Sequence, residues 1–224
     1  KKLNITIFTG GSGNKEILNI IKDIPWIDIT IITNCYDDGK STGRLRYLIN
    51  GMLGPSDIRK NVGNLIKIDN SIGIVLKKII EFRLKKTSFQ KLFQDYASDK
   101  NDLKILINNL PKKLYEKINK YIIFFLKKFK NKKKIEYDIS LGNLIFAGIF
   151  LKFQNFNKSV KEFNEIFLNT QKVFNITDGE NLYLTALREN GEIIYEEGDL
   201  VEKQGKNIAD IFLTKEKFLS NRKE

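Results

Sequence analysis

The architecture follows from Leu3-Asn4-Ile5-Thr6-Ile7-Phe8-Thr9-Gly10-Gly11-Ser12-Gly13, an extended apolar run that ends in a glycine turn. The run predicts a β-strand, and apolar residues at helical spacing follow it between Ile17 and Ile21. A second β-branched run, Asp28 to Asn34, comes after the turn residues Pro25 and Trp26 and predicts a buried parallel strand. Strand, glycine turn, helix and strand together make a βαβ unit.

A second segment with the composition of a phosphate-ligand site follows that strand directly. It reads Cys35-Tyr36-Asp37-Asp38-Gly39-Lys40-Ser41-Thr42-Gly43-Arg44-Leu45-Arg46 and brings together paired carboxylates, glycines, hydroxyls and two arginines. In a βαβ unit, ligands bind beyond the carboxyl ends of the strands, where helix N-termini present free N–H groups to anions. Because this segment and the glycine turn both lie at such ends, we expect them to face one crevice.

Neither glycine segment matches a stricter nucleotide-binding pattern. The first turn departs from the dinucleotide fingerprint, because two glycines are adjacent and Ile17 stands where the last small residue is expected. The second segment is not a P-loop, because Asn34 occupies the position where that pattern needs a glycine. A purely structural interpretation of the first turn stays open, since glycine suits any tight strand-to-helix connection and Ser12 could cap the helix.

A third motif, Gly51-Met52-Leu53-Gly54-Pro55-Ser56-Asp57-Ile58-Arg59-Lys60-Asn61, predicts a helix that begins near its proline. First-turn serine and aspartate stabilise a helix without any ligand, so a structural role is the alternative here too. Asp57 and Asn61 lie four residues apart and share a helix face, which lets both address one metal or polyol, whereas Arg59 points elsewhere.

The fourth motif is Ser140-Leu141-Gly142-Asn143-Leu144. Gly142 permits close backbone approach, and Asn143 offers both a donor and an acceptor to a ligand. The alternative is a glycine-mediated contact between helix and sheet with Asn143 as a cap, and the residues alone do not decide between the two.

The four motifs occur in the order seen in the 2-phospho-L-lactate transferase/gluconeogenesis-factor family, that is, CofD-like and YvcK-like proteins. The resemblance rests on Phe8 to Gly13, Asp37 to Arg46, Gly54 to Arg59 and Ser140 to Leu144, and it spans residue 3 to about residue 205. The second motif is closer to the YvcK-like branch. The resemblance implies an α/β fold, a Rossmann-like three-layer sandwich with a mainly parallel sheet, and a ligand that bears a phosphate or nucleotide.

Two features depart from the family pattern. YvcK-like members commonly place a histidine just before the fourth motif, whereas this sequence has Ile139 there and contains no histidine. Relatives also continue into a Gly-Pro-Gly-Ser-type loop that helps to build the ligand site, and this sequence stops at Glu224 before such a loop. The chain therefore resembles a C-terminally incomplete member.

We expect a single domain with three parts. Residues 1–70 form the N-terminal βαβ ligand-binding part, 71–134 a helical insertion, and 135–224 the returning helix, strands and a hairpin. The amphipathic helices of the insertion form a cap over the sheet or part of a homodimer surface. Strands are predicted at Gln171 to Thr177 and Leu182 to Arg188, and Asn190-Gly191 marks a hairpin. The tail from Asn207 is expected to begin an element whose partners lie outside this chain.

Composition narrows the class of protein. The formal net charge is +12, but only six of the 39 basic residues are arginines, and the scattered lysines indicate solubility more than nucleic-acid binding. The densest cluster, Lys127 to Lys134, suits the negative end of a helix. A single cysteine, Cys35, excludes an intramolecular disulfide framework and is expected to be buried. No membrane span or cleavable leader is visible, so we expect a cytoplasmic protein.

Two functional hypotheses follow, and both use the same residues. In the first, a Mg²⁺-dependent transferase passes a phospholactyl-type group from a nucleotide-linked donor to an acceptor hydroxyl, as the resemblance implies. The candidate catalytic and metal-holding residues are Asp37, Asp38 and Asp57. The candidate ligand-binding residues are Gly10, Gly11, Ser12, Gly13, Gly39, Ser41, Thr42, Gly43, Arg44, Arg46, Ser56, Arg59, Asn61, Gly142 and Asn143. In the second, the same site binds a UDP-sugar without catalysis and regulates carbon or cell-envelope metabolism, because no nucleophile or tuned general base is evident.

Overall fold

The computed structural model describes residues 1–84, 88–98, 102–131, 139–170, 172–195 and 207–215, with residues 40 and 41 described by their backbone alone. Its main sheet has three parallel strands in the order β1-β2-β5, namely β1 (Leu3–Thr9), β2 (Ile27–Thr33) and β5 (Val173–Asn175). Leu3 pairs with Ile27 and Ile31 with Val173, so the carboxyl ends of all three strands lie at one edge.

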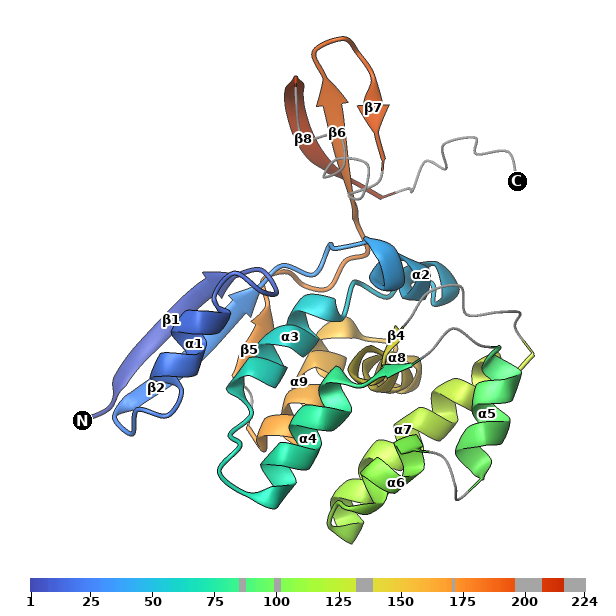
Figure 1. Cartoon of the computed structure of the whole chain (residues 1–224). Coiled ribbons are helices and arrows are strands. Elements are labelled where there is room, and N and C mark those ends of the chain that lie inside the picture. Colours follow the sequence, from blue (N-terminus) through green and yellow to red (C-terminus); the bar gives the residue numbers. More distant parts are fainter. Residues whose placement is uncertain (85–87, 99–101, 132–138, 171, 196–206, 216–224) are drawn as a thin grey trace.

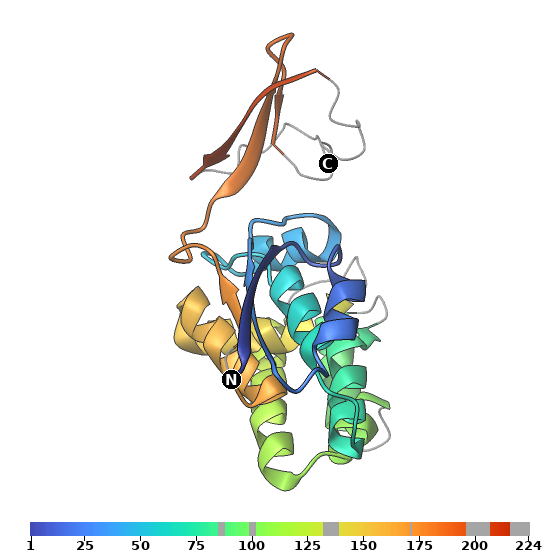
Figure 2. The same cartoon turned by 90° about the vertical axis from the view of Figure 1, so that its left-hand side faces the viewer.

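Helix α1 (Lys15–Ile21) joins β1 to β2 and completes the βαβ unit. The inward side chains of β2 and β5, such as Ile31 and Val173, are fully buried. Helices α3 (Ser56–Leu65) and α9 (Phe156–Leu168) pack against this part of the sheet (Figures 1 and 2). The expected Rossmann-like α/β fold with a mainly parallel sheet is thus confirmed.

The opposite face of the main sheet carries apolar side chains that stay accessible in the described part of the chain. Phe8, Ile32 and Phe174 occupy one row across the three strands, because they are paired in register. Phe8 is 68% exposed and Ile176, which continues the row of β5, is 55% exposed. This row forms one wall of the candidate site described below.

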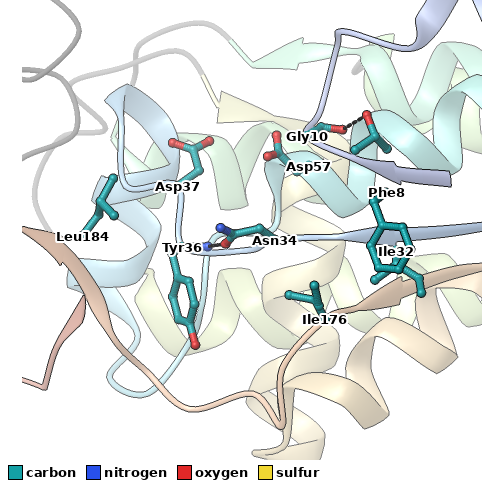
Figure 3. Close-up of a pocket in the computed structure, with 10 residues that line it drawn as sticks. Phe8, Gly10, Ile32, Asn34, Tyr36, Asp37, Asp57, Ile176 and Leu184 are labelled. Carbon is teal, nitrogen blue, oxygen red and sulfur yellow. Dashed lines mark hydrogen bonds between the residues drawn. The ribbon is translucent and has the colours of Figure 1, made fainter. Parts of the chain in front are cut away.

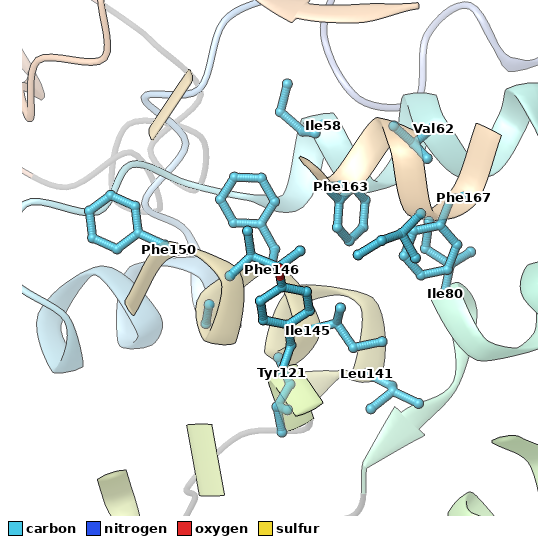
Figure 4. Close-up of a cluster of buried hydrophobic side chains, with 14 of the residues drawn as sticks. Ile58, Val62, Ile80, Tyr121, Leu141, Ile145, Phe146, Phe150, Phe163 and Phe167 are labelled. Carbon is cyan, nitrogen blue, oxygen red and sulfur yellow. The ribbon is translucent and has the colours of Figure 1, made fainter. Parts of the chain in front are cut away.

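Helix α8 (Leu141–Phe153) is the centre of the core, because every residue from Leu141 to Phe150 is buried. It packs against α4 (Ser71–Glu81), α7 (Lys112–Phe129) and α9. The Phe146 ring packs at a tilt against Phe156 and edge-to-face against Phe163, with ring centroids 5.2 and 5.5 Å apart. These contacts tie α8 to α9, and Figure 4 shows Phe146 beside Phe163. A predominantly apolar helix of this kind is typical of a central core element rather than of a surface element.

The helical insertion is closed at its base by two short antiparallel strands, β3 (Arg83–Leu84) and β4 (Ile139–Ser140). Between them lie α5 (Phe89–Ala97), α6 (Asp102–Asn108) and α7. Rings of Phe89, Phe125 and Phe129 cluster between α5 and α7. The chain therefore leaves and re-enters the body at one place, and α4, at the start of the expected range 71–134, packs with α3 and α8 as well as with α6 of the insertion. Residues 132–134 of the predicted lysine cluster lie outside the described residues.

A separate antiparallel sheet of order β7-β6-β8 stands away from the body (Figure 1). It consists of β6 (Tyr183–Arg188), β7 (Ile193–Ile194) and β8 (Ile208–Thr214). The predicted hairpin is confirmed, with Gly191 at a φ of +83° and its N–H donating to the Arg188 carbonyl at 2.9 Å. The expectation that the tail from Asn207 lacks a partner in this chain was wrong, because β8 pairs along β6. The two strands are separated in sequence by β7 and the chain after it, and the residues of the tail alone do not indicate which strand they pair with.

Among the described residues, we find no helix with both the length and the apolar character needed to cross a bilayer.

Gly148 sets the spacing between α7 and α8, because a Cβ built there would overlap the Tyr121 carbonyl oxygen. We predict that Gly148→Ala lowers the free energy of unfolding by about 1–3 kcal/mol, since the backbone contact must open even though alanine favours helix. Urea denaturation measures this. Gly13→Ala is the control, because nothing lies within 4 Å of a Cβ at that position. Equal losses for the two variants would contradict the close-approach argument.

Candidate functional site

A cavity of about 410 Å³ opens at the carboxyl edge of the main sheet (Figure 3). Its walls come from β1 and β2, from the loops that follow them, from the start of α3, from the segment after β5 and from the start of β6. The lining residues are Phe8, Thr9, Gly10, Ile32, Asn34, Tyr36, Asp37, Asp57, Ile176 and Leu184. The crevice expected at the strand ends is therefore present.

The loop after β2 makes two successive side-chain-to-backbone turns. The Asn34 side-chain oxygen accepts from the Tyr36 N–H at 2.8 Å, and the Asp37 carboxylate accepts from the Gly39 N–H at 2.8 Å. Gly39 then serves as N-cap residue of α2 (Lys40–Leu48). Asparagine and aspartate favour this local bonding, which turns the chain sharply from strand to helix. The turns place Asp37 at the cavity wall.

Two glycines of the predicted motifs pack tightly on this loop. A Cβ on Gly43 would overlap the Asp38 carbonyl oxygen, and one on Gly54 would overlap that of Asp37. The Gly54 N–H also donates to the Cys35 carbonyl at 2.8 Å. Cys35 is buried, as expected, and burial, with a smaller contribution from Asp57, raises the pKa of its thiol. Gly43 and Gly54 thus have a structural reason to be glycine.

Asp57 stands in the first turn of α3, and its side chain is 17% exposed. Burial raises the pKa of this carboxyl, and the neighbouring Asp37 charge raises it further, while Lys60, with Nζ 3.4 Å from Oδ1, lowers it. Gly11 lies against the carboxylate, because a Cβ at Gly11 would overlap Oδ1. Figure 3 shows Asp37 and Asp57 on the same side of the Asn34 side chain.

The glycine turn after β1 is held by α3 and keeps N–H groups available. The Asn61 side-chain amide donates to the Gly10 carbonyl at 2.9 Å and to the backbone carbonyl of Asp57 at 3.0 Å. Asn61 therefore holds the turn and does not line the cavity, and the shared ligand role of Asp57 and Asn61 stays a prediction. Ser12 accepts from Lys15 through its backbone carbonyl at 3.3 Å, and its hydroxyl does not cap α1. Within the described residues, no hydrogen bond engages the N–H groups of Gly11, Ser12 and Gly13.

Four predicted ligand residues form a buried hydrogen-bond network instead of lining the cavity. The Thr42 and Ser56 hydroxyls are hydrogen-bonded to each other, and the Asn143 amide donates to Ser56 at 3.0 Å. Arg59 Nε donates to the Asn143 side-chain oxygen at 3.1 Å. The network joins α2, α3 and α8. It also places Arg59 away from Asp57 and Asn61, as predicted.

The residues of the fourth motif have structural roles, although not the ones that the sequence predicted. Ser140, and not Asn143, caps α8, since its hydroxyl accepts from the Asn143 N–H at 3.2 Å. A Cβ on Gly142 would lie 2.7 Å from the Ile80 carbonyl oxygen and 2.8 Å from Arg59 Cδ. The close approach that glycine allows is therefore between helices rather than between helix and sheet. Burial lowers the pKa of Arg59, and the Arg83 charge lowers it further.

The two arginines of α2 have different surroundings. Arg46 is 3% exposed and donates to backbone carbonyls on two loops. Arg44 is partly exposed, and its guanidinium lies 5.6 Å from the centroid of the Tyr47 ring. The Ser41 side chain lies outside the described residues. Gly13 and Gly39 belong to the two loops that contribute to the cavity, but they are not lining residues themselves.

The lining therefore contains only part of the predicted site. Gly10, Asp37 and Asp57 reach the cavity, whereas the Asp38 side chain is buried beside it. The structure adds Phe8, Thr9, Ile32, Asn34, Tyr36, Ile176 and Leu184. Phe8 and Asn34 follow from strand alternation and from the polar residue at a strand end, but Ile176 and Leu184 carry no local signal. Over the described part of the chain, no group of three or more His, Cys, Asp or Glu side chains is placed to hold a metal ion.

Comparison with known proteins assigns a family to this arrangement. Residues 5–223 match the family described as 2-phospho-L-lactate transferase CofD. The chain belongs to the CofD family. Among individual relatives, it is 25% identical over 214 residues to the gluconeogenesis factor of Halalkalibacterium halodurans and 26% identical over 216 residues to that of Bacillus subtilis.

The chain spans about half the length of these relatives. The two alignments cover 96% of this CofD-family chain but only 50% and 51% of the relatives. A crystal structure of a UPF0052-family protein from Bacillus halodurans superposes with a TM-score of 0.61 at 24% identity, again over 96% of this chain and 51% of the other. That likeness shows the shared fold.

Asp57→Asn should change how stability depends on pH. The folded pKa of Asp57 lies above its ordinary value of 3.8, so between these two pKa values the native state binds more protons than the unfolded state. The free energy of unfolding therefore falls as pH rises through this window, and the full cost is present above it. We expect the asparagine variant to lack this loss and to be at least as stable as the wild type at pH 7, measured by urea denaturation from about pH 3.5 to 8. An unchanged pH profile would contradict the buried-carboxylate assignment.

Asn143→Ala should destabilise the chain strongly. The change removes the acceptor of Arg59 Nε and one of the two partners of the Ser56 hydroxyl, which keeps its bond to Thr42, at an expected cost of about 2–4 kcal/mol. Asn109→Ala is the control, because Asn109 is exposed and should change stability by less than about 0.5 kcal/mol. Equal effects in thermal or urea unfolding would show that the network contributes little.

Proposed function

We propose that the chain binds a phosphate-bearing, nucleotide-type ligand in the strand-end cavity. The observation that carries the proposal is the cavity itself, which combines two carboxylates, the Gly10 end of the glycine turn and an apolar wall in about 410 Å³. Small-molecule sites commonly have this size and this mixture of apolar walls with a few polar groups. Its place at the carboxyl ends of β1 and β2 is where open α/β sheets bind ligands.

Each wall of the cavity suits one part of such a ligand. Next to Gly10, which lines the cavity, the N–H groups of Gly11, Ser12 and Gly13 make no hydrogen bond within the described residues, and successive backbone amides of this kind favour anions such as phosphate. Phe8, Ile32 and Ile176 offer an apolar surface for a planar or aliphatic group. Asn34 and Tyr36 supply hydrogen-bonding groups between these two regions.

Asp37 and Asp57 would hold Mg²⁺ together with phosphate oxygens. The Asp37 charge raises the Asp57 pKa, so the two carboxylates repel each other and a cation between them would relieve that repulsion. Magnesium typically binds through one or two protein carboxylates plus substrate phosphates, which fits two aspartates better than the predicted three. When bound, the ion would neutralise phosphate charge, and Asp37 and Asp57 would orient it.

Two activities are compatible with this site. In the transferase hypothesis the bound donor passes a phospholactyl-type group to an acceptor hydroxyl, with positioning and charge stabilisation as the main contributions. In the second hypothesis the site binds a UDP-sugar without catalysis. The relatives are named gluconeogenesis factors rather than transferases, which agrees with a non-catalytic role, as does a sequence without histidine. Because the chain covers half of those relatives, both remain proposals for this half.

A thermal-shift series with UDP-sugars, guanine nucleotides and phospholactate, each with and without Mg²⁺, tests the binding proposal. At about 100-fold excess over Kd, a ligand adds about 2.7 kcal/mol, or roughly 5–10 °C for a chain of this size. A UDP-sugar shift without Mg²⁺ would support the sensor, and a Mg²⁺-dependent guanine-nucleotide shift the transferase. No shift with any compound would count against binding by this chain.

Asp37→Asn separates the metal role from the fold. Asparagine keeps an oxygen that accepts from the Gly39 N–H, so the loop is retained while the charge is lost. We expect the Mg²⁺-dependent part of the ligand shift to fall by at least about tenfold in apparent affinity, about 1.4 kcal/mol. Asp23→Asn is the matched control, because Asp23 lies in the turn between α1 and β2, at the opposite edge of the sheet. An unchanged Mg²⁺ dependence in Asp37→Asn would remove that carboxylate from the metal site.

A further inference from the structure

Arg46 is a charged side chain with almost no solvent contact. It lies in α2, is 3% exposed, and does not line the cavity. A guanidinium offers five N–H donors in a fixed fork, and burying it is costly unless these donors meet acceptors. The acceptors of the Arg46 guanidinium therefore indicate which parts of the chain this buried side chain holds in place.

One side of the guanidinium holds the loop after β2. Nη1 donates to the Tyr36 carbonyl at 2.8 Å and reaches the Asp37 carbonyl at 3.5 Å. Both residues line the cavity. The bonds hold the peptide groups on either side of the Asp37 Cα, and with them the backbone that carries the carboxylate.

The other side holds the segment that leads into the separate sheet. Nη2 donates to the Asn181 side-chain oxygen at 3.1 Å and to the Leu182 carbonyl at 2.5 Å. The guanidinium carbon also lies 4.4 Å from the centroid of the Tyr183 ring, within cation–π range. The next residue, Leu184, is both the second residue of β6 and a wall of the cavity.

We propose that Arg46 is a positioning residue that joins the β7-β6-β8 sheet to the ligand cavity, by fixing the Asp37 loop and the Leu184 wall with one guanidinium. The proposal rests on the proposed function for its consequence, which is that the geometry offered to a ligand depends on where this sheet is held. Arg46 itself lies 135 positions from Asn181 in sequence. Whatever binds or displaces the sheet then acts on Asp37 through Arg46.

The first test needs no ligand. Amide hydrogen exchange of the free chain compares wild type with Arg46→Met and with Arg44→Met, the control on the same helix, whose guanidinium lies over Tyr47 instead. Arg46→Met should speed exchange about tenfold or more in both 34–39 and 181–184, as loss of charge-assisted bonds predicts. Arg44→Met should change neither segment. An increase in only one segment, or an equal increase throughout the α7–α8 core, would overturn the proposal.

A second variant tests the bridge in case Arg46→Met unfolds the whole chain. Asn181→Ala removes one acceptor and leaves Arg46 and α2 intact, so the fold should persist. It should speed exchange at 34–39 as well as near the mutation, although position 181 is distant in sequence. Exchange confined to 181–184 would contradict the bridge.

Ligand binding provides the readout that a merely structural role would not change. If the wild type gives a Mg²⁺-dependent shift, Arg46→Lys should lose about tenfold in Mg²⁺-dependent affinity with less effect on the Mg²⁺-independent part, because one ammonium cannot serve both loops. A wild type without any shift would reject the proposed function and leave the exchange test of Arg46 valid. Equal losses in both parts would show that Arg46 supports only the fold.

Discussion

The candidate site depends on one steric constraint, the close contact of three backbone segments around the loop after β2. Gly43 from α2 and Gly54 before α3 leave no room for a side chain against the Asp38 and Asp37 carbonyl groups. Any larger residue at either position would push a helix away from the loop. Asp37 and Asp57 can line one cavity only because both helices approach this closely. Gly43 and Gly54 are thus explained by packing before any ligand is considered.

Buried hydrogen bonds then hold the helices that the glycine contacts bring close to the loop. The buried network of Thr42, Ser56, Asn143 and Arg59 joins the starts of three helices. Buried groups of this kind are costly unless every partner is present, so they select one arrangement of α2, α3 and α8. Much of the motif chemistry is therefore directed inward. The surface left for a ligand is smaller than the motifs indicate.

Local patterns predicted the parts of the structure that local chemistry determines. The β-branched runs predicted β1 and β2, the glycine turn placed a helix after β1, and Asn190-Gly191 predicted the hairpin. The rule that ligands bind at the carboxyl ends of parallel strands also predicted where the cavity lies. Sequence spacing could not reveal that Arg46 turns inward to Leu182, that Leu184 closes a wall, or that β8 pairs with β6. Those features join residues that are far apart in the chain. Local sequence patterns contain no information about such contacts, so only the folded structure reveals them.

The electrostatics of the cavity favour a ligand that carries a cation. Asp57 is kept largely from water at the start of a helix, and both burial and the Asp37 charge raise its pKa. Lys60 offsets part of this cost but lies at one side, with its Nζ 3.4 Å from the carboxylate. A chain under no functional demand would gain stability from an asparagine at this position, because neutral amides avoid the repulsion. A carboxylate pair held at a cost beside free backbone N–H groups is the combination that a metal-bound phosphate would stabilise from both sides, with the cation on the aspartates and the phosphate on the glycine turn.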